Sequence, residues 1–186
     1  MEKGKIIYLN GLSASGKTTL AETLQNRLNK PFYWVAQDVI VGCMYPQKFL
    51  DDAGFLEALS LLFHTVKFYS DMGINSIVDV AHYYHRDSKK IWNESLTLLH
   101  EYPVLFVHVT CPPEERRRRR AERGDPEVDE NKWAYWLEQF EPKEPYDITV
   151  DTFKNSPEEC AEKIIKLLDY PEKFTAFKTL WAQRSN

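Results

Sequence analysis

The sequence has few cysteines and no long apolar run. Its three cysteines are scattered, and no CxxC or Cys/His spacing joins Cys43, Cys111 and Cys160. A disulfide framework and a zinc site are therefore not indicated, and free thiols fit a reducing cytoplasm. The first apolar run, which follows Lys5, ends after residue 9 and is too short for an export signal. No stretch approaches the roughly 18 apolar residues of a membrane span.

An excess of charge of one sign is also missing. The chain has 24 Lys and Arg against 28 Asp and Glu, which gives a net charge of −4. This balance gives no reason to expect a nucleic acid or an anionic membrane as a partner. With 186 residues, 43% of them hydrophobic, and no internal repeat or long linker, we expect one cytoplasmic domain over residues 1–186.

Short apolar runs alternate with longer amphipathic stretches, a pattern typical of a parallel sheet with helices on both faces. The predicted strands are Lys5–Asn10, Phe32–Gln37, Ser76–Ala81, Val104–Thr110 and Asp147–Val150. The predicted helices cover residues 16–29, 49–71, 86–101, a stretch from Pro112, 156–168 and 172–183. These elements predict a three-layer α/β domain with a five-stranded parallel sheet.

Two segments have a special character. Residues 124–146 are irregular but rich in aromatic side chains, and we expect a lid over about 120–145. The last predicted helix carries Phe174, Phe177 and Trp181 on one face. That stripe is either core or a contact between two copies of the chain, so a homo-oligomer stays possible.

The motif that predicts chemistry is Gly11-Leu12-Ser13-Ala14-Ser15-Gly16-Lys17-Thr18, which matches G-x-x-x-x-G-K-[ST] between a strand and a helix. Backbone N–H groups of Gly11, Ser13, Ala14, Ser15, Gly16 and the following residues Thr18 and Thr19 would surround phosphate oxygens. Lys17 would reach the β- and γ-phosphates, and the Thr18 hydroxyl would bind Mg²⁺. The alternative, a glycine-rich turn with a surface lysine, fits the strand–loop–helix context poorly. The cofactors expected are therefore ATP and Mg²⁺.

Two aspartates lie near the carboxyl ends of predicted strands, where ligands bind in such sheets. We assign Asp38 as the base that takes the proton of an attacking hydroxyl; the alternative is a cap of the segment that follows it. We assign Asp79 as the residue that orients Mg²⁺ through water and lines the substrate site; the alternative is a carboxylate satisfied within the sheet core.

The acceptor is expected to meet the loop after the third strand and the lid. The candidate contacts are His82, Tyr83, Tyr84, His85 and Arg86, with Trp133 and Trp136 from the lid. An ordinary polar loop remains the alternative for the first group.

Arginines occupy positions 116 to 120 and position 123. On a helix, Arg116, Arg120 and Arg123 share a face. We interpret Arg120 and Arg123 as catalytic residues that neutralise charge on the transferring phosphate, with Arg119 as a less favoured substitute. The other arginines fit a solvated face paired with nearby glutamates, and binding of a polyanion is not favoured.

These features together resemble the chloramphenicol phosphotransferase family of small P-loop kinases. The resemblance rests on segments in matching order, which are Ile7–Thr18, Gln37-Asp38-Val39-Ile40 with Met44 and Pro46, Ile77-Val78-Asp79-Val80, Arg119/Arg120 to Arg123-Gly124-Asp125, Tyr146–Thr152, Ser156 and Glu159-Cys160-Ala161. It implies transfer of the ATP γ-phosphate to a substrate hydroxyl with Asp38 as base, and it places the loop from Thr152 to Asn155 near the adenine.

The sequence departs from the family at the lid. Pro126 stands where the family often has an arginine, and Glu141 stands near the position of a histidine. The resemblance thus supports the reaction type and does not support chloramphenicol as the acceptor. We predict a kinase for a small hydroxyl compound. The alternatives are an adenylylsulfate or gluconate type of kinase, and a non-catalytic nucleotide-binding or RNA-associated protein.

Overall fold

The structure is a computed structural model that describes residues 2–81, 88–124 and 145–184. Its centre is a five-stranded sheet in the order β2-β3-β1-β4-β5, in which all neighbouring strands are parallel. The strands are β1 (Ile6–Asn10), β2 (Phe32–Ala36), β3 (Asn75–Val80), β4 (Val104–Thr110) and β5 (Ile148–Asp151). The predicted fold class and sheet are confirmed, and the strand ends shift by at most one residue.

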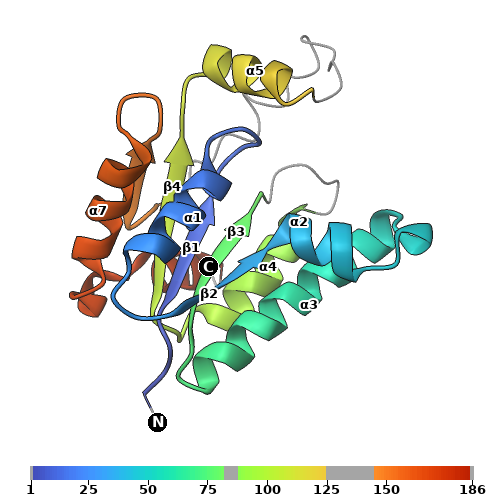
Figure 1. The fold of residues 1–186 in the computed structure, drawn as a ribbon. Helices are drawn as coiled ribbons and strands as arrows, with labels where there is room; N and C mark the ends of the chain where they lie inside the picture. The colour runs from blue at the N-terminus through green and yellow to red at the C-terminus, as the bar shows by residue number, and fades with distance from the viewer. Residues whose placement is uncertain (1, 82–87, 125–144, 185–186) are drawn as a thin grey trace.

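The helices cover both faces of the sheet (Figure 1). They are α1 (Lys17–Arg27), α2 (Gln37–Val39), α3 (Asp52–Asp71), α4 (Ser88–Leu99), α5 (Pro113–Glu122), α7 (Pro157–Leu167) and α8 (Ala176–Arg184). A π-helical segment, Ile40–Met44, and two 3-10 turns, Gln47–Phe49 and Pro171–Lys173, complete the described elements. No helix in the described ranges has the length and apolar character needed to cross a bilayer.

Alternation along each strand divides the core into two layers. In β1, Ile7 and Leu9 face α1 and α7, whereas Ile6 and Tyr8 face α3, α4 and α8. Tyr8 is at the centre of the second layer, where its ring packs against Phe63, Phe106 and Phe177. The strands are buried on both faces, which explains their nearly continuous apolar sequences.

Two helices begin three or four residues later than the sequence pattern predicts, and side-chain caps explain both cases. The helix expected from residue 49 begins at Asp52, because Asp51 accepts a hydrogen bond from the Gly54 N–H at 2.8 Å. The helix expected from residue 172 begins at Ala176, because Asp147 accepts from the N–H groups of residues 175 and 176. By contrast, the helix predicted from residue 156 begins at Pro157, where Ser156 and Glu159 form a capping box.

The C-terminal stripe belongs to the core. Phe174 and Phe177 are buried, and Trp181 packs against the same layer as Phe177 at its edge. This favours the core interpretation of the stripe over a contact between copies. Of the expected lid, residues 125–144 lie outside the described residues, and positions 120–122 form the end of α5.

Candidate active site

The loop between β1 and α1 has the backbone conformation that a phosphate-binding loop needs. Ala14 and Gly16 have left-handed conformations, with φ angles of 61° and 95°. A Cβ at Gly11 would lie 2.2 Å from the carbonyl oxygen of Val109, so the loop passes too close to β4 for a side chain here. The loop leads directly into Lys17, the first residue of α1, and the N–H groups at a helix start have no acceptor within the helix.

Lys17 is held against this loop. Its ammonium donates to the carbonyl oxygens of Gly11 at 3.0 Å and Leu12 at 3.3 Å, and the side chain is buried. Burial lowers the pKa of Lys17, and the nearby carboxylates of Asp79 and Asp38 oppose that shift. The two carboxylates favour the charged form of Lys17, and the charged ammonium is the form that attracts a phosphate.

Thr18 and Asp79 meet at the edge of the sheet. The Thr18 hydroxyl donates to Oδ2 of Asp79 at 3.1 Å, and Asp79 is 7% exposed. Burial raises the pKa of the Asp79 carboxyl, whereas Lys17 and the Thr18 hydrogen bond lower it. Asp79 is therefore satisfied within the protein and also lines the cleft described below, so the two interpretations of this residue are compatible.

Asp38 is exposed in the short helix α2 after β2. The N-cap of that helix is Ala36, so the interpretation of Asp38 as a helix cap is wrong. The preceding residue fixes the local backbone, because Gln37 Oε1 accepts a hydrogen bond from the Ala81 N–H at 3.1 Å. That contact ties the end of β2 to the end of β3 and holds Asp38 beside the cleft.

One cleft of about 590 Å³ brings most of the predicted residues together. It is lined by Ser13, Ala14, Gly16, Lys17, Thr18, Thr19, Leu20, Gln37, Asp38, Asp79, Val80, Ala81, Arg119, Arg120, Glu122, Arg123, Thr152 and Pro157. The predicted acceptor contacts His82, Tyr83, Tyr84, His85, Arg86, Trp133 and Trp136 lie outside the described residues.

The arginines of α5 and its C-terminal end separate into different environments. Arg120 and Arg123 line the cleft, and Arg123 donates to the Ser13 hydroxyl at 3.4 Å. Arg118 pairs with Glu115 and Glu122, as expected for a solvated face. Arg116 differs from the prediction, because it is buried away from the cleft lining and donates to the Cys111 carbonyl oxygen at 2.6 Å. Helical spacing indicates which side chains share a face but not where the turn before the helix places a carbonyl acceptor.

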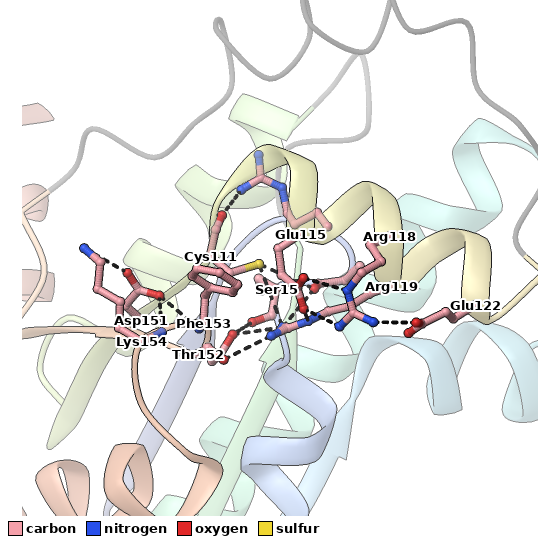
Figure 2. Close-up of polar contacts among 12 residues, drawn as sticks. Ser15, Cys111, Glu115, Arg118, Arg119, Glu122, Asp151, Thr152, Phe153 and Lys154 are labelled. Carbon is pink, nitrogen blue, oxygen red and sulfur yellow. Dashed lines mark hydrogen bonds and ion pairs between the residues drawn. The ribbon is translucent and has the colours of Figure 1, made fainter.

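Arg119 joins α5 to the segment after β5 (Figure 2), although the sequence favours Arg120 and Arg123 over it as catalytic residues. Its Nε donates to Glu115 at 2.7 Å, and its terminal nitrogens donate to the Thr152 hydroxyl at 2.9 Å and the Thr152 carbonyl oxygen at 3.0 Å. From the sequence, the i, i+4 spacing indicated only one of these contacts, the one between Glu115 and Arg119. The contact with Thr152, 33 residues away, had no sequence signal.

Thr152 closes one side of the phosphate-binding loop. Its hydroxyl donates to the carbonyl oxygen of Ser15 at 2.7 Å, and its N–H donates to the carbonyl oxygen of Thr110 at 2.9 Å. The predicted nucleotide residue thus lies directly against the loop, at the start of the segment that the family resemblance places near the adenine.

Comparison with known proteins identifies a family and a curated relative. The family model described as chloramphenicol phosphotransferase-like protein matches residues 4–169. An adenylyl-sulfate kinase of Clostridium acetobutylicum is 27% identical over 175 residues, which cover 90% of this chain and 84% of that protein.

Solved structures show the same fold. An APS kinase of Mycobacterium tuberculosis, in complex with AMPPNP and APS, has a TM-score of 0.65 at 19% identity, with 91% of this chain and 99% of that chain covered. A sugar kinase of Janibacter sp. HTCC2649 has a TM-score of 0.63 at 21% identity, with 91% and 98% covered. The fold around the cleft is therefore shared with proteins named as kinases.

Proposed function

The chain belongs to the chloramphenicol phosphotransferase-like family of small P-loop kinases, and on that premise we propose that it transfers the γ-phosphate of ATP to a hydroxyl group of a small molecule. The observation that carries the proposal is the arrangement of the phosphate-binding loop. Lys17 and Thr18 lie within a single cleft that also contains the carboxylates of Asp38 and Asp79.

The loop would hold the triphosphate. Its backbone N–H groups and the N-terminus of α1 supply partial positive charge, and the Lys17 ammonium adds a full charge. Because Lys17 donates to the carbonyl oxygens of Gly11 and Leu12, it is already restricted to the loop. Little side-chain freedom would be lost when it turns to phosphate oxygens.

Thr18 and Asp79 fit a magnesium site. Both offer oxygen atoms, the ligand type that Mg²⁺ prefers, and the 3.1 Å contact between them brings a hydroxyl and a carboxylate to one point of the cleft. Mg²⁺ commonly keeps several waters and takes few protein ligands, so two such residues suffice. When bound, the ion neutralises phosphate charge. The buried Asp79 carboxylate would hold it, directly or through water, beside the triphosphate.

Asp38 is our choice for the general base. Its carboxylate is exposed on the cleft lining, caps no described helix, and is held by the adjacent Gln37–Ala81 contact. A carboxylate so placed can accept the proton of a hydroxyl as its oxygen attacks the γ-phosphorus. Arg120 and Arg123, which line the same cleft, would stabilise negative charge on the transferring group.

The acceptor is best sought among compounds of the related kinases. The relative from Clostridium acetobutylicum is named an adenylyl-sulfate kinase, and one solved structure is named a sugar kinase. The test panel should therefore contain adenylyl sulfate and sugars beside chloramphenicol-like alcohols. The Asp38 carboxylate serves any of these acceptors, so the proposed reaction does not depend on which one is correct.

The test is an acceptor panel scored by ADP release and by mass gain of the acceptor, with Lys17→Ala as the blank. We expect at least one hydroxyl compound to raise ADP release by the wild-type protein and not by the variant. Calorimetry that detects no binding of Mg·ATP to the wild-type protein would overturn the proposal. Salt-sensitive RNA binding without acceptor-stimulated turnover would instead favour the RNA-associated alternative.

A further inference from the structure

We infer that Glu115, Arg119 and Thr152 form a positioning cluster, called here the Arg119 cluster, that sets nucleotide affinity without taking part in phosphoryl transfer. The inference rests on the proposed binding of a nucleotide at the phosphate-binding loop. The cluster would hold that loop in its binding conformation, a role that the proposed mechanism assigns to no other residue.

Arg119 connects three separate segments of the chain. Its Nε donates to Glu115 Oε1 at 2.7 Å within α5. One terminal nitrogen donates to the Thr152 hydroxyl at 2.9 Å and, over a longer distance of 3.4 Å, to the Ala14 carbonyl oxygen. The other donates to the Thr152 carbonyl oxygen at 3.0 Å. All three nitrogens of the guanidinium therefore donate to protein acceptors, which leaves Arg119 few of its five N–H groups for a phosphate.

Thr152 passes this contact on to the phosphate-binding loop (Figure 2). Its hydroxyl accepts from Arg119 and donates to the Ser15 carbonyl oxygen at 2.7 Å. The Thr152 side chain also lies against Gly16, where a Cβ added to the glycine would be 3.1 Å from Thr152 Oγ1. The contacts of the cluster thus reach the loop at Ala14, Ser15 and Gly16.

Two of those loop residues have left-handed backbone conformations. Gly16, with φ 95°, adopts this conformation without a steric penalty, whereas φ 61° is costly for Ala14 and persists where surrounding contacts determine it. The Ala14 and Ser15 carbonyl oxygens are fixed by Arg119 and Thr152, so the N–H groups of the same peptide units keep their direction. A loop that is already in its binding conformation loses less freedom when phosphate binds.

Glu115 orients the guanidinium. It is 8% exposed and accepts hydrogen bonds from both Arg118 and Arg119. The carboxylate fixes the Nε edge of Arg119, which turns the terminal nitrogens toward Thr152. Arg118 shares the same carboxylate, but its other hydrogen bond goes to Glu122 on the same helix, so it offers a matched control.

The test separates binding from turnover. Arg119→Met should weaken binding of Mg·ADP by about 10-fold or more, because the competent loop becomes a minor conformation, while kcat at saturating ATP stays within about 3-fold of wild type. Arg118→Met should change neither quantity by more than about 2-fold, because the hydrogen bonds of Arg118 go to Glu115 and Glu122 of the same helix and not to Thr152 or the loop. Binding is measured by calorimetry, which needs no acceptor.

Two further variants test the connection through Thr152. Thr152→Val removes the hydroxyl and should weaken Mg·ADP binding in the same way, whereas Thr152→Ser should keep wild-type affinity. The double variant Arg119→Met/Thr152→Val should bind no more weakly than the weaker single variant, because residues that act through one network are not additive. If Arg119→Met does not fold, Arg119→Lys and Thr152→Val carry the same measurement.

The outcomes separate this inference from the proposed function. Unchanged nucleotide binding in Arg119→Met and Thr152→Val would overturn the inference. A fall in kcat with unchanged binding in Arg119→Met would also overturn it, because Arg119 would then act as a residue that contacts the phosphate. A wild-type protein that binds no nucleotide would overturn the proposed function itself. Weaker binding with kcat retained in Arg119→Met, but not in Arg118→Met, supports the inference.

Discussion

Thr18 and Asp79, which are 61 residues apart, are joined by a hydrogen bond of 3.1 Å from hydroxyl to carboxylate. The bond connects the first turn of α1 to β3, the neighbour of β1 in the sheet. It also places two oxygen-bearing side chains near the Lys17 ammonium, whose charge lowers the pKa of Asp79 against the effect of burial. A polar pair at the end of a buried strand is costly unless it is satisfied, and here each partner satisfies the other.

Asp79→Asn tests the magnesium role of this pair. An amide keeps the size of the side chain but loses the negative charge that attracts the cation. We expect the Mg²⁺ concentration for half-maximal activity to rise by about 10-fold or more, the range seen when partners around a bound metal are changed. Thr18→Ser retains the hydroxyl and is the matched control. A wild-type magnesium dependence in Asp79→Asn would exclude the role.

Asp38→Asn tests the general base. The variant should lower kcat by about 10²–10⁴-fold, the usual loss when a positioned base is removed. Nucleotide binding should stay within about 3-fold, because Asp38 belongs to α2 and not to the loop proposed to hold the phosphates. Steady-state kinetics with the identified acceptor and calorimetry with Mg·ADP check the two statements. Full turnover in Asp38→Asn would show that another group accepts the proton.

Gly16→Ala tests the backbone of the phosphate-binding loop. A left-handed conformation costs alanine roughly 1–2 kcal/mol more than glycine. At Gly16 the new Cβ would also lie 3.1 Å from the Thr152 hydroxyl and 3.3 Å from the Arg119 guanidinium. We expect Gly16→Ala to lower the free energy of unfolding, measured in urea, and to weaken Mg·ADP binding in calorimetry.

Gly124→Ala, outside this loop, is the control for Gly16→Ala. Gly124 also has a positive φ, 70°, but its Cβ would meet nothing within 4 Å among the described residues. It should therefore show the conformational cost alone and keep nucleotide binding. Equal effects of the two substitutions on Mg·ADP affinity would contradict the crowding argument.

The fold and the phosphate-binding loop could be predicted from the sequence because their signals are local. An apolar strand, the run from Gly11 to Thr18 and an amphipathic helix are contiguous, and their physics needs no distant partner. Asp38 and Asp79 could be found from their places at strand ends, since parallel strands bring those ends to one edge.

The rest depends on contacts between distant parts of the chain. From its position on the helix alone, Arg119 is a less favoured catalytic candidate than Arg120 and Arg123. Its environment depends on the contact with Thr152. Likewise, helical spacing groups Arg116 with the cleft arginines, whereas the Cys111 carbonyl holds it elsewhere. Side chains of this length reach any of several acceptors, so only the assembled structure selects one.

Glu115→Gln tests the charge at the centre of the Arg119 cluster through the pH dependence of stability. Hydrogen bonds from Arg118 and Arg119 lower the pKa of Glu115 to about 2 from its ordinary 4.5. A carboxyl whose pKa is depressed in the folded state adds stability above pH 4.5 and loses it as the pH falls from 4.5 toward 2. The wild-type protein should therefore exceed Glu115→Gln in stability at neutral pH, and the difference should narrow in acid.

Urea unfolding at several pH values measures that difference, and subtraction removes the other titrating groups common to both proteins. Glu114→Gln, an exposed position one residue earlier, controls for the loss of one negative charge. A difference that stays constant from neutral pH into acid would show that the carboxylate of Glu115 is not specially stabilised by the two arginines.

Asp147→Ala should destabilise the protein without affecting the nucleotide site. One carboxylate oxygen accepts from the Phe106 N–H at 2.8 Å, and the other accepts from the N–H groups of Thr175 at 2.8 Å and Ala176 at 3.0 Å. The residue therefore joins β4, the start of β5 and the N-terminus of α8. Loss of a helix cap costs about 0.5–2 kcal/mol, and a partly buried strand N–H without its acceptor adds to that cost.

The two layers of the core explain why Asp147→Ala should change stability and not nucleotide binding. Phe177 of α8 packs with Tyr8 and Phe106 on the face of the sheet opposite α1 and α7, whereas the phosphate-binding loop leads into α1. Asp147→Ala should thus lower the melting temperature by several degrees while Mg·ADP affinity at 25 °C is retained. Asp169→Ala, an exposed carboxylate between α7 and α8, should melt like the wild type. Weaker nucleotide binding by folded Asp147→Ala would mean that the two layers of the core are coupled more closely than their separate packing indicates.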